Sequence, residues 1–226
     1  MNTAIIVAAG SGSRFGSEQL KQFVEILGKP IIIHTLERFE ACPEVDEIVL
    51  VLSESAIAEF QISNFGSEIS KLKKLVAGDS TRAGSVRKGL NAVNSQTEIV
   101  VIHDGARPLV SVDEIAATIE KAKEIGAACL VGAVTDTIKT IRGDEISGTL
   151  DRAKLRRALT PQAFKIEVLR SAFALGDVSE AATDECYLVE KLGHPIAFVE
   201  GSSRNIKITY PNDLIFAEAM LSGKIG

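Results

Sequence analysis

The segment Ala8-Ala-Gly-Ser-Gly-Ser-Arg-Phe-Gly16 combines glycines with a cation directly after an apolar run, and Lys21 lies seven residues beyond Arg14. Glycines let the backbone approach a phosphate closely, and successive N–H groups can cradle its oxygens. Two fixed positive charges beside such a loop suit a step in which negative charge accumulates on a phosphoryl group. The pattern therefore predicts a loop that binds a nucleoside triphosphate.

Two other kinds of glycine-rich loop fit the sequence less well. A P-loop needs Gly-Lys followed by Ser or Thr, and this triplet occurs nowhere in the chain. A dinucleotide-binding loop needs an acidic residue roughly 20 residues beyond the glycines, at the end of the second strand. Here that distance falls in the helix expected from Pro30, whereas the second strand ends at Ser53-Glu54. The sequence thus disfavours a NAD-linked oxidoreductase.

A carboxylate and a second arginine follow another apolar run. Ile99–His103 is expected to form a buried strand that carries Asp104 at its carboxyl end, and Gly105-Ala-Arg-Pro108 comes next. A carboxylate at a strand tip that faces phosphates is well placed to hold Mg²⁺, directly or through water. Arg107 can then clamp a second phosphate. An alternative is a turn that Asp104 and Pro108 simply stabilise.

Two further segments carry polar groups at element ends. Gly78–Ser85 leads from a strand into a helix, so its N–H groups and the Ser85 hydroxyl can hold a base or a ribose. Helix capping within the same segment is a compatible alternative. Asn205–Thr209 is expected to be an apolar strand, and an ammonium group such as that of Lys207 is costly to bury there unless it is paired. A phosphate would be a suitable partner.

The elements that must position these groups form an α/β pattern. Continuous apolar runs separated by helix-length segments predict strands covered on both faces, and therefore a doubly wound, Rossmann-like, mostly parallel sheet. The Ser111 and Glu114 pair reads as a capping box that starts one of the helices. The runs are Thr3–Ala8, Glu47–Leu52, Leu72–Ala77, Glu98–His103 and Ala127–Val134.

The alternation breaks after residue 134. Asp136–Ile141 and Ile146–Leu150 flank a polar turn that contains glycine, which predicts a β-hairpin arm at about residues 135–152. Such an arm must bury its apolar side chains against a partner subunit or fold back on its own domain. The rest of the chain predicts helices near Lys165–Leu175 and Thr183–Leu192, a strand at Pro195–Glu200 and a helix from about Pro211. We expect a single domain over residues 1–226.

Composition narrows the class of protein. The net charge of −5 gives no domain-wide basic field for nucleic acid. No apolar stretch approaches the ~20 residues that a membrane span needs. The chain has three cysteines, which are widely spaced and form no C-x-x-C pair. This pattern favours reduced thiols in a cytoplasmic protein. The histidines lack ligand spacing and are interpreted as structural. These residues are Cys42, Cys129, Cys186, His34, His103 and His194.

Taken in order, the motifs resemble one family. They are Ala-Ala-Gly-x-Gly-x-Arg, Lys-Gln, His-Asp-Gly-Ala-Arg-Pro, Asp-Thr-Ile-Lys, Leu-Thr-Pro-Gln, Thr-Asp-Glu and Asn-Ile-Lys-Ile-Thr. From Thr3 to about Leu221 the chain is similar to the 2-C-methyl-D-erythritol 4-phosphate cytidylyltransferases of the non-mevalonate isoprenoid pathway. One departure is Leu20, which stands before Lys21 where the family usually has proline.

The resemblance implies transfer of CMP from CTP to a polyol phosphate, with release of pyrophosphate and with Mg²⁺ bound at Asp104. It implies a homodimer in which each arm reaches the neighbouring subunit's site. Transition-state stabilisation would fall to Arg14, Lys21 and Lys207. Cytosine and ribose would be held at Ala8, Ala9, Gly10, Gly12, Gly78 and Ser85. The polyol phosphate would be held by Arg107, Thr160 and Thr183, with Thr137 and Arg152 coming from the partner's arm.

Two alternatives stay open at this point. A ribitol 5-phosphate cytidylyltransferase would share the fold and the CTP chemistry. Tyr210-Pro-Asn-Asp-Leu214 and the His-Asp-Gly-Ala-Arg-Pro motif lean toward methylerythritol phosphate. A regulator that binds CTP without turnover is the other alternative. It has no need of several charges around the α-phosphate, so the cationic residues speak against it.

Overall fold

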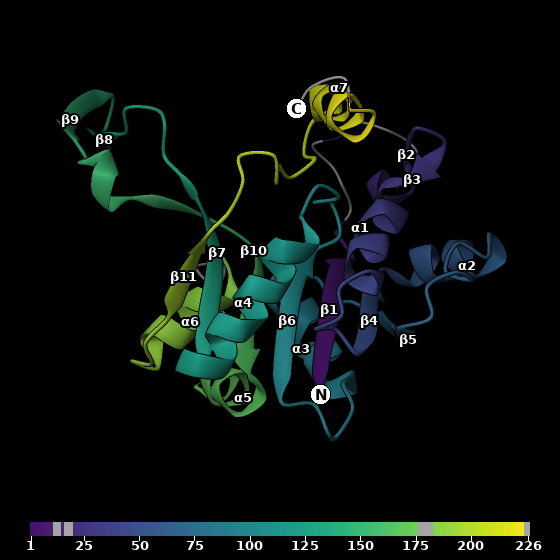
Figure 1. The fold of residues 1–226 in the computed structure, drawn as a ribbon. Coiled ribbons are helices and arrows are strands. Elements are labelled where there is room, and N and C mark those ends of the chain that lie inside the picture. Colours follow the sequence, from purple (N-terminus) through teal and green to yellow (C-terminus); the bar gives the residue numbers. More distant parts are fainter. Residues whose placement is uncertain (11–14, 16–19, 176–182, 224–226) are drawn as a thin grey trace.

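A central β-sheet organises the computed structural model, which describes residues 1–10, 15, 20–175 and 183–223 (Figure 1). Within these residues the sheet has seven strands, in the order β11-β7-β10-β6-β1-β4-β5. Their bounds are β1 Asn2–Ala8, β4 Glu47–Leu52, β5 Leu72–Ala77, β6 Ile99–Asp104, β7 Ala127–Ala133, β10 Arg156–Lys165 and β11 Ala197–Glu200.

Most of the neighbouring strands run parallel. β6, β1, β4 and β5 form one parallel block, and β11 pairs parallel with β7. β10 is antiparallel to both of its neighbours, β6 and β7. The mostly parallel sheet predicted from the apolar runs is confirmed, and each of the five runs matches a strand to within one residue at either end.

Helices cover both faces of the sheet. The side chains of Ala4 and Ile6 in β1 enter one apolar cluster, shared with α1, α2 and α4. Ile5 enters a second cluster, shared with α3, α5 and α6. This alternation is why the strands are apolar throughout. The helices are α1 Ile31–Glu40, α2 Glu54–Ile62, α3 Arg82–Ala92, α4 Val112–Ile125, α5 Ile166–Ala174, α6 Glu185–Lys191 and α7 Pro211–Leu221.

The capping box that opens α4 is present as predicted. Ser111 Oγ accepts a hydrogen bond from the amide of Glu114 at 3.1 Å, and Glu114 Oε2 accepts one from the amide of Ser111 at 2.8 Å. The other oxygen of this carboxylate, Oε1, accepts from the amide of Ser202 at 2.6 Å. A single glutamate therefore starts α4 and also fixes the chain as it leaves β11.

Two expectations about strands were wrong. β10 was not foreseen, although it lies in the middle of the sheet. Its sequence carries two arginines and Pro161, and the pairing with β7 shifts register between Ala158 and Gln162. Conversely, Asn205–Thr209 joins no sheet. It is an extended segment whose Ile208 amide donates to the carbonyl oxygen of Ala106 at 2.9 Å.

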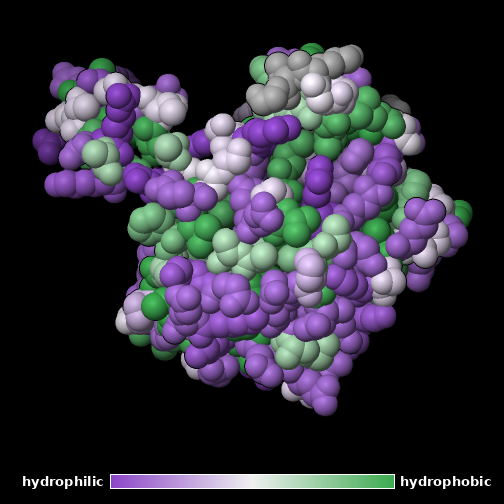
Figure 2. All heavy atoms as spheres, viewed as in Figure 1, coloured by the Kyte–Doolittle hydropathy of each residue, from purple (hydrophilic) through white to green (hydrophobic). Residues whose placement is uncertain are grey.

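The predicted hairpin arm is present and projects from the body of the molecule (Figure 1). β8 is Lys139–Arg142 and β9 is Glu145–Thr149, paired antiparallel. Ile141 is 74% exposed and Ile146 is 68% exposed, so the arm does not bury these side chains on its own domain. Figure 2 shows hydrophobic residues on the surface of this arm.

A small third cluster holds the chain near the C-terminus. It joins Phe15, Ile208 and Ala217 of α7 to Ile31 at the start of α1 and to Ile26 of the short strand β2 (Glu25–Ile26), which pairs with β3 (Lys29–Pro30). All three cysteines of the chain are buried and free, as expected. No helix among the described residues has the length and apolar character to cross a membrane.

Candidate active site

A cavity of about 540 Å³ opens at the carboxyl ends of the parallel strands. Its walls come from the end of β1, the segment that leads into α3, the tip of β6, the short 3₁₀ helix Lys21–Phe23 and the extended segment after β11. Open α/β sheets bind ligands at this edge. The volume lies within the range of small-molecule sites, which is ~300–1,000 Å³.

One wall depends on a close approach between two segments. A Cβ atom added to Gly78 would lie 2.3 Å from the Cβ of Ala9 and 3.0 Å from Ser85 Oγ. Ser85 Oγ accepts from the amide of Asp79 at 2.9 Å and donates to the carbonyl oxygen of Thr81 at 2.9 Å. Glycine at position 78 is therefore required to bring the end of β1 against the turn before α3. Five of the residues predicted to hold the base and the ribose, Ala8, Ala9, Gly10, Gly78 and Ser85, therefore lie close together.

Asp104, at the tip of β6, is the electrostatic centre of the cavity. Its Oδ1 lies 3.1 Å from Arg82 Nε, while its Oδ2 lies 2.9 Å from Lys207 Nζ and 3.4 Å from Arg107 Nε. Burial alone would raise the pKa of the Asp104 carboxyl, but the three cations hold this pKa well below its usual range. Asp104 is therefore ionised at neutral pH.

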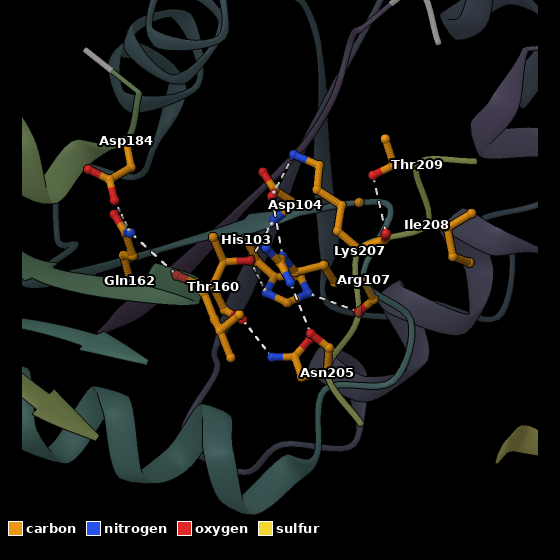
Figure 3. A network of polar contacts seen from close by, with 12 residues as sticks. His103, Asp104, Arg107, Thr160, Gln162, Asp184, Asn205, Lys207, Ile208 and Thr209 are labelled. Carbon is orange, nitrogen blue, oxygen red and sulfur yellow. Dashed lines mark hydrogen bonds and ion pairs between the residues drawn. The ribbon is translucent and has the colours of Figure 1, made fainter. Parts of the chain in front are cut away.

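A chain of hydrogen bonds runs from the backbone amide of Asp104 through Thr160 and His103 to the backbone of Arg107 (Figure 3). The amide of Asp104 donates to Thr160 Oγ1 at 3.1 Å, and Thr160 Oγ1 lies 3.0 Å from His103 Nδ1. His103 Nε2 lies 3.1 Å from the carbonyl oxygen of Arg107, which can only accept. Nε2 therefore carries the proton, and the Thr160 hydroxyl donates to Nδ1. The interpretation of His103 as a structural residue fits this arrangement.

Asn205 ties the extended segment to the same network. The side-chain Nδ2 of Asn205 donates to the carbonyl oxygen of Thr160 at 2.9 Å. The backbone carbonyl oxygen of Asn205 accepts from Arg107 Nη1 at 2.9 Å. Lys21 Nζ donates to the carbonyl oxygen of Ile208 at 3.0 Å. The segment is therefore held at Asn205 and at Ile208, on either side of Lys207, whose Nζ lies 2.9 Å from Asp104 Oδ2. Lys207 is 37% exposed and is paired with Asp104, so its ammonium is not buried without a partner.

The start of α6 is attached to β10. Gln162 Nε2 donates to Asp184 Oδ2 at 3.0 Å, and Gln162 Oε1 accepts from the amide of Cys186 at 3.2 Å. Asp184 also caps α6, since its Oδ1 accepts from the amide of Tyr187 at 2.9 Å. Thr183 therefore lies just before a fixed helix N-terminus.

Comparison with known proteins decides the class. The family model for 2-C-methyl-D-erythritol 4-phosphate cytidylyltransferase matches residues 2–223. This chain belongs to that family. Among its relatives, the cytidylyltransferase of Desulforamulus reducens is 42% identical over 96% of this chain and 94% of its own length. That of Halalkalibacterium halodurans is 42% identical over 98% of this chain and 97% of its own.

Solved structures of the cytidylyltransferase family share the fold. The 4-diphosphocytidyl-2C-methyl-D-erythritol synthase of Anaerococcus prevotii superposes with a TM-score of 0.86, at 32% identity over 98% of this chain and 96% of that one. The 2-C-methyl-D-erythritol 4-phosphate cytidylyltransferase of Thermus thermophilus gives a TM-score of 0.77, at 31% identity over 98% of this chain and all of its own.

Several of the residues predicted for a cytidylyltransferase site are brought together. Those that line the cavity are Ala8, Ala9, Gly10, Lys21, Ser85, Asp104 and Lys207. Two further predicted residues contact these lining residues: Gly78 packs against Ala9, and Arg107 contacts Asp104. The hydroxyl of Thr160 is engaged inside the protein, so its contact with substrate stays a prediction. Gly12 and Arg14 lie outside the described residues.

The arm residues do not line the cavity of their own chain. Thr137 precedes β8 and Arg152 follows β9, on the part of the molecule that projects outward (Figure 1). Arg152 Nη1 donates to the carbonyl oxygen of Thr135, which ties the two ends of the arm together. A role for either residue in binding substrate requires a second copy of the chain.

Sequence reasoning missed Arg82 and Glu185. Arg82 lines the cavity, contacts Asp104 and donates from Nη1 to both carboxylate oxygens of Glu185, at 2.7 and 2.8 Å. Both residues belonged to motifs that were singled out, Gly78–Ser85 and Thr-Asp-Glu. What the sequence lacked was their pairing, because 103 positions separate them.

The donor set fits a magnesium ion that arrives with a nucleotide. Among the described residues no three His, Cys, Asp or Glu side chains form a closed metal site. Asp104 and Asp79 are the carboxylates among the described cavity-lining residues. Mg²⁺ is usually held by one or two carboxylates together with substrate phosphates. Asp104, at the centre of the cations, is the residue that would hold it.

Proposed function

We propose that this chain transfers CMP from CTP to 2-C-methyl-D-erythritol 4-phosphate. The products are 4-diphosphocytidyl-2-C-methylerythritol and pyrophosphate, so the enzyme serves isoprenoid precursor synthesis. The observation that carries the proposal is the placement of Lys21 and Lys207 on one cavity with Asp104 and the end of β1. Membership of the cytidylyltransferase family over nearly the whole chain supports it.

The reaction requires positioning and charge stabilisation more than proton transfer. A substrate phosphate is already anionic near pH 7, and its oxygen attacks the α-phosphorus in line while pyrophosphate leaves. Lys21, Lys207 and Arg14 stabilise the charge that builds up on the α-phosphoryl oxygens. Bound Mg²⁺, held at Asp104, would supply further neutralisation of the triphosphate.

The nucleotide is read largely by backbone groups. Ala8, Ala9 and Gly10 end β1 in the cavity, and Gly12 belongs to the same loop. Gly78–Ser85 forms the opposite wall, whose backbone the Ser85 hydroxyl holds in place. A pocket formed by rigid main chain suits a flat pyrimidine base and its ribose.

The second substrate is bound between two subunits. Arg107, Thr160 and Thr183 approach it from the body of one subunit, and Thr137 and Arg152 from the partner's arm. The exposed apolar residues of the arm support a homodimer, because exposed apolar patches often mark sites of protein–protein contact. Three free, buried cysteines and a net charge of −5 favour a cytoplasmic enzyme that does not bind nucleic acid.

Pyrophosphate release tests the proposal. The purified chain is given CTP and Mg²⁺ with either 2-C-methyl-D-erythritol 4-phosphate or ribitol 5-phosphate. We expect release with methylerythritol phosphate alone. Release with ribitol phosphate alone would keep the mechanism and overturn the substrate. A folded chain that binds CTP but releases no pyrophosphate with either polyol phosphate would instead be a regulator.

A further inference from the structure

The three cations around Asp104 are not equivalent. Within the described residues, Lys207 and Arg107 share Oδ2, whereas Arg82 is the partner of Oδ1. The second partner of Arg107 is a neutral backbone carbonyl, that of Asn205. The second partner of Arg82 is a full carboxylate, that of Glu185. Arg82 therefore bridges two carboxylates.

Glu185 anchors Arg82 strongly. Its side chain is fully buried, and both of its oxygens accept from Arg82 Nη1, at 2.7 and 2.8 Å. Burial raises the pKa of Glu185, and the guanidinium of Arg82 opposes that rise. An arginine that moved away would leave this carboxylate alone in the interior, which is a costly state. Arg82 thus has an anchor that is independent of Asp104.

Lys207 and Arg107 have no comparable anchor in the described part of the chain. The carboxylate that each contacts is Asp104, and the Lys207 side chain is 37% exposed at the cavity. A triphosphate, or the phosphate of a second substrate, offers these two cations new anionic partners. If both turned to the substrates, Arg82 would be the one of these three cations that stays on Asp104.

We propose that Arg82, anchored by Glu185, is the positioning residue that holds Asp104 in place during nucleotidyl transfer. The inference rests on the proposed function and deepens it. Arg82 begins α3 within the wall assigned to the nucleotide, Gly78–Ser85, and Glu185 begins α6 two residues after Thr183. The pair therefore also sets the distance between the nucleotide side and the polyol phosphate side of the site.

The test separates positioning from simple structural support. Arg82→Met and Glu185→Gln each disturb the pair, and each should lower the Tm by roughly 5–10 °C because a buried charge loses its partner. The double variant Arg82→Met/Glu185→Met replaces the pair by apolar side chains of similar volume. Its Tm should return to within a few degrees of the wild type, since such replacements are often neutral.

In the double variant, catalytic turnover should stay low even though thermal stability recovers. We expect kcat for pyrophosphate release to fall about 10–100-fold in Arg82→Met and to stay low in the stable double variant, with KM for CTP changed by less than about threefold. Arg82→Lys keeps the charge and should recover part of kcat. The matched controls are Arg156→Met and Glu200→Gln, an arginine–glutamate pair at 2.8 Å on the surface, and both should behave as the wild type.

Three results would overturn the proposal. One is a wild-type kcat in Arg82→Met. Another is recovery of kcat together with Tm in the double variant, which would mean that the pair only supports the fold. The third is a rise in KM for CTP with kcat unchanged, which would make Arg82 a substrate contact. A wild-type protein that releases no pyrophosphate is a different result, because it rejects the proposed function itself.

Discussion

His103 Nε2 donates a hydrogen bond to the carbonyl oxygen of Arg107 at 3.1 Å, so the histidine at the tip of β6 holds the backbone of an arginine that contacts Asp104. The ring is fully buried, and its other nitrogen accepts from Thr160. Burial lowers the pKa of His103 to about 4, although Asp104 opposes the change. The imidazole is neutral at pH 7, which leaves Nδ1 able to accept.

This arrangement predicts how stability depends on pH. An unfolded histidine takes up a proton near pH 6.5, whereas folded His103 does so only near pH 4. Protons therefore favour the unfolded chain, and stability is lost as the pH falls from 6.5 to 4. The loss from this residue should be about 3 kcal/mol of unfolding free energy. Urea unfolding of the wild type and of His103→Gln at pH 7, 5.5 and 4.5 measures it.

His103→Gln should lose less stability over this interval than the wild type, because glutamine cannot titrate. His194→Gln, outside the network, is the matched control and should keep the wild-type slope. Equal slopes in His103→Gln and the wild type would show that another group controls acid sensitivity.

Lys21 is expected to act in the transition state. Its ammonium lies on the cavity and is steadied by the carbonyl oxygen of Ile208 at 3.0 Å. Lys21→Ala should lower kcat by roughly 10²–10³, the loss expected when one preorganised donor is removed. Lys29→Ala removes a lysine paired with Glu37 away from the cavity and is the control. Steady-state pyrophosphate release gives both rates, and wild-type turnover in Lys21→Ala would reject the catalytic role.

Sharing of sites between subunits can be tested by mixing two inactive chains. Arg152→Ala removes the arm's contribution, and Lys21→Ala removes the body's contribution. In a mixed dimer, one of the two sites then has both residues intact. After equal mixing with full exchange, activity should recover to about a quarter of the wild type, because half the dimers are mixed. Mixed dimers verified by mass and still inactive would place Arg152 in its own subunit's site.

The apolar tip of the arm is expected to be buried in the dimer. Ile141→Asp and Ile146→Asp introduce charges where a partner should cover the surface, and each should shift the protein toward monomer by a factor of ten or more in the dissociation constant. Sedimentation equilibrium measures this shift. Leu175→Asp, at an exposed leucine after α5, is the control. A dimer of unchanged strength in both arm variants would mean that another surface joins the subunits.

The sheet was predictable where local pattern and long-range packing agree. Continuous apolar runs marked β1, β4, β5, β6 and β7, because strands covered by helices on both faces need apolar side chains throughout. β10 escaped because it starts with Arg156 and Arg157 and contains Pro161, and proline within a run normally argues against a central strand. The register shift at Ala158 and Gln162 accommodates that proline, and no local signal announces it.

The sequence identified several charged residues of the site but did not show which of them form ion pairs with each other. Asp104, Lys21 and Lys207 stand out as charged residues beside apolar segments. Which cation contacts which carboxylate depends on how distant segments meet, as with Arg82 and Glu185. Asn205–Thr209 misled for a related reason. Its alternating apolar residues suit a strand, whereas the structure uses Ile208 as an anchor in a small cluster beside α7.

The antiparallel course of β10 has a consequence for the arm. Ala133, the last residue of β7, is the register partner of Arg156, the first residue of β10. The arm thus connects two residues that are paired with each other in the sheet, at the carboxyl end of β7. Its length can change without disturbing the packing of the body, and the geometry of the assembled dimer can be retuned independently of the fold that binds the nucleotide.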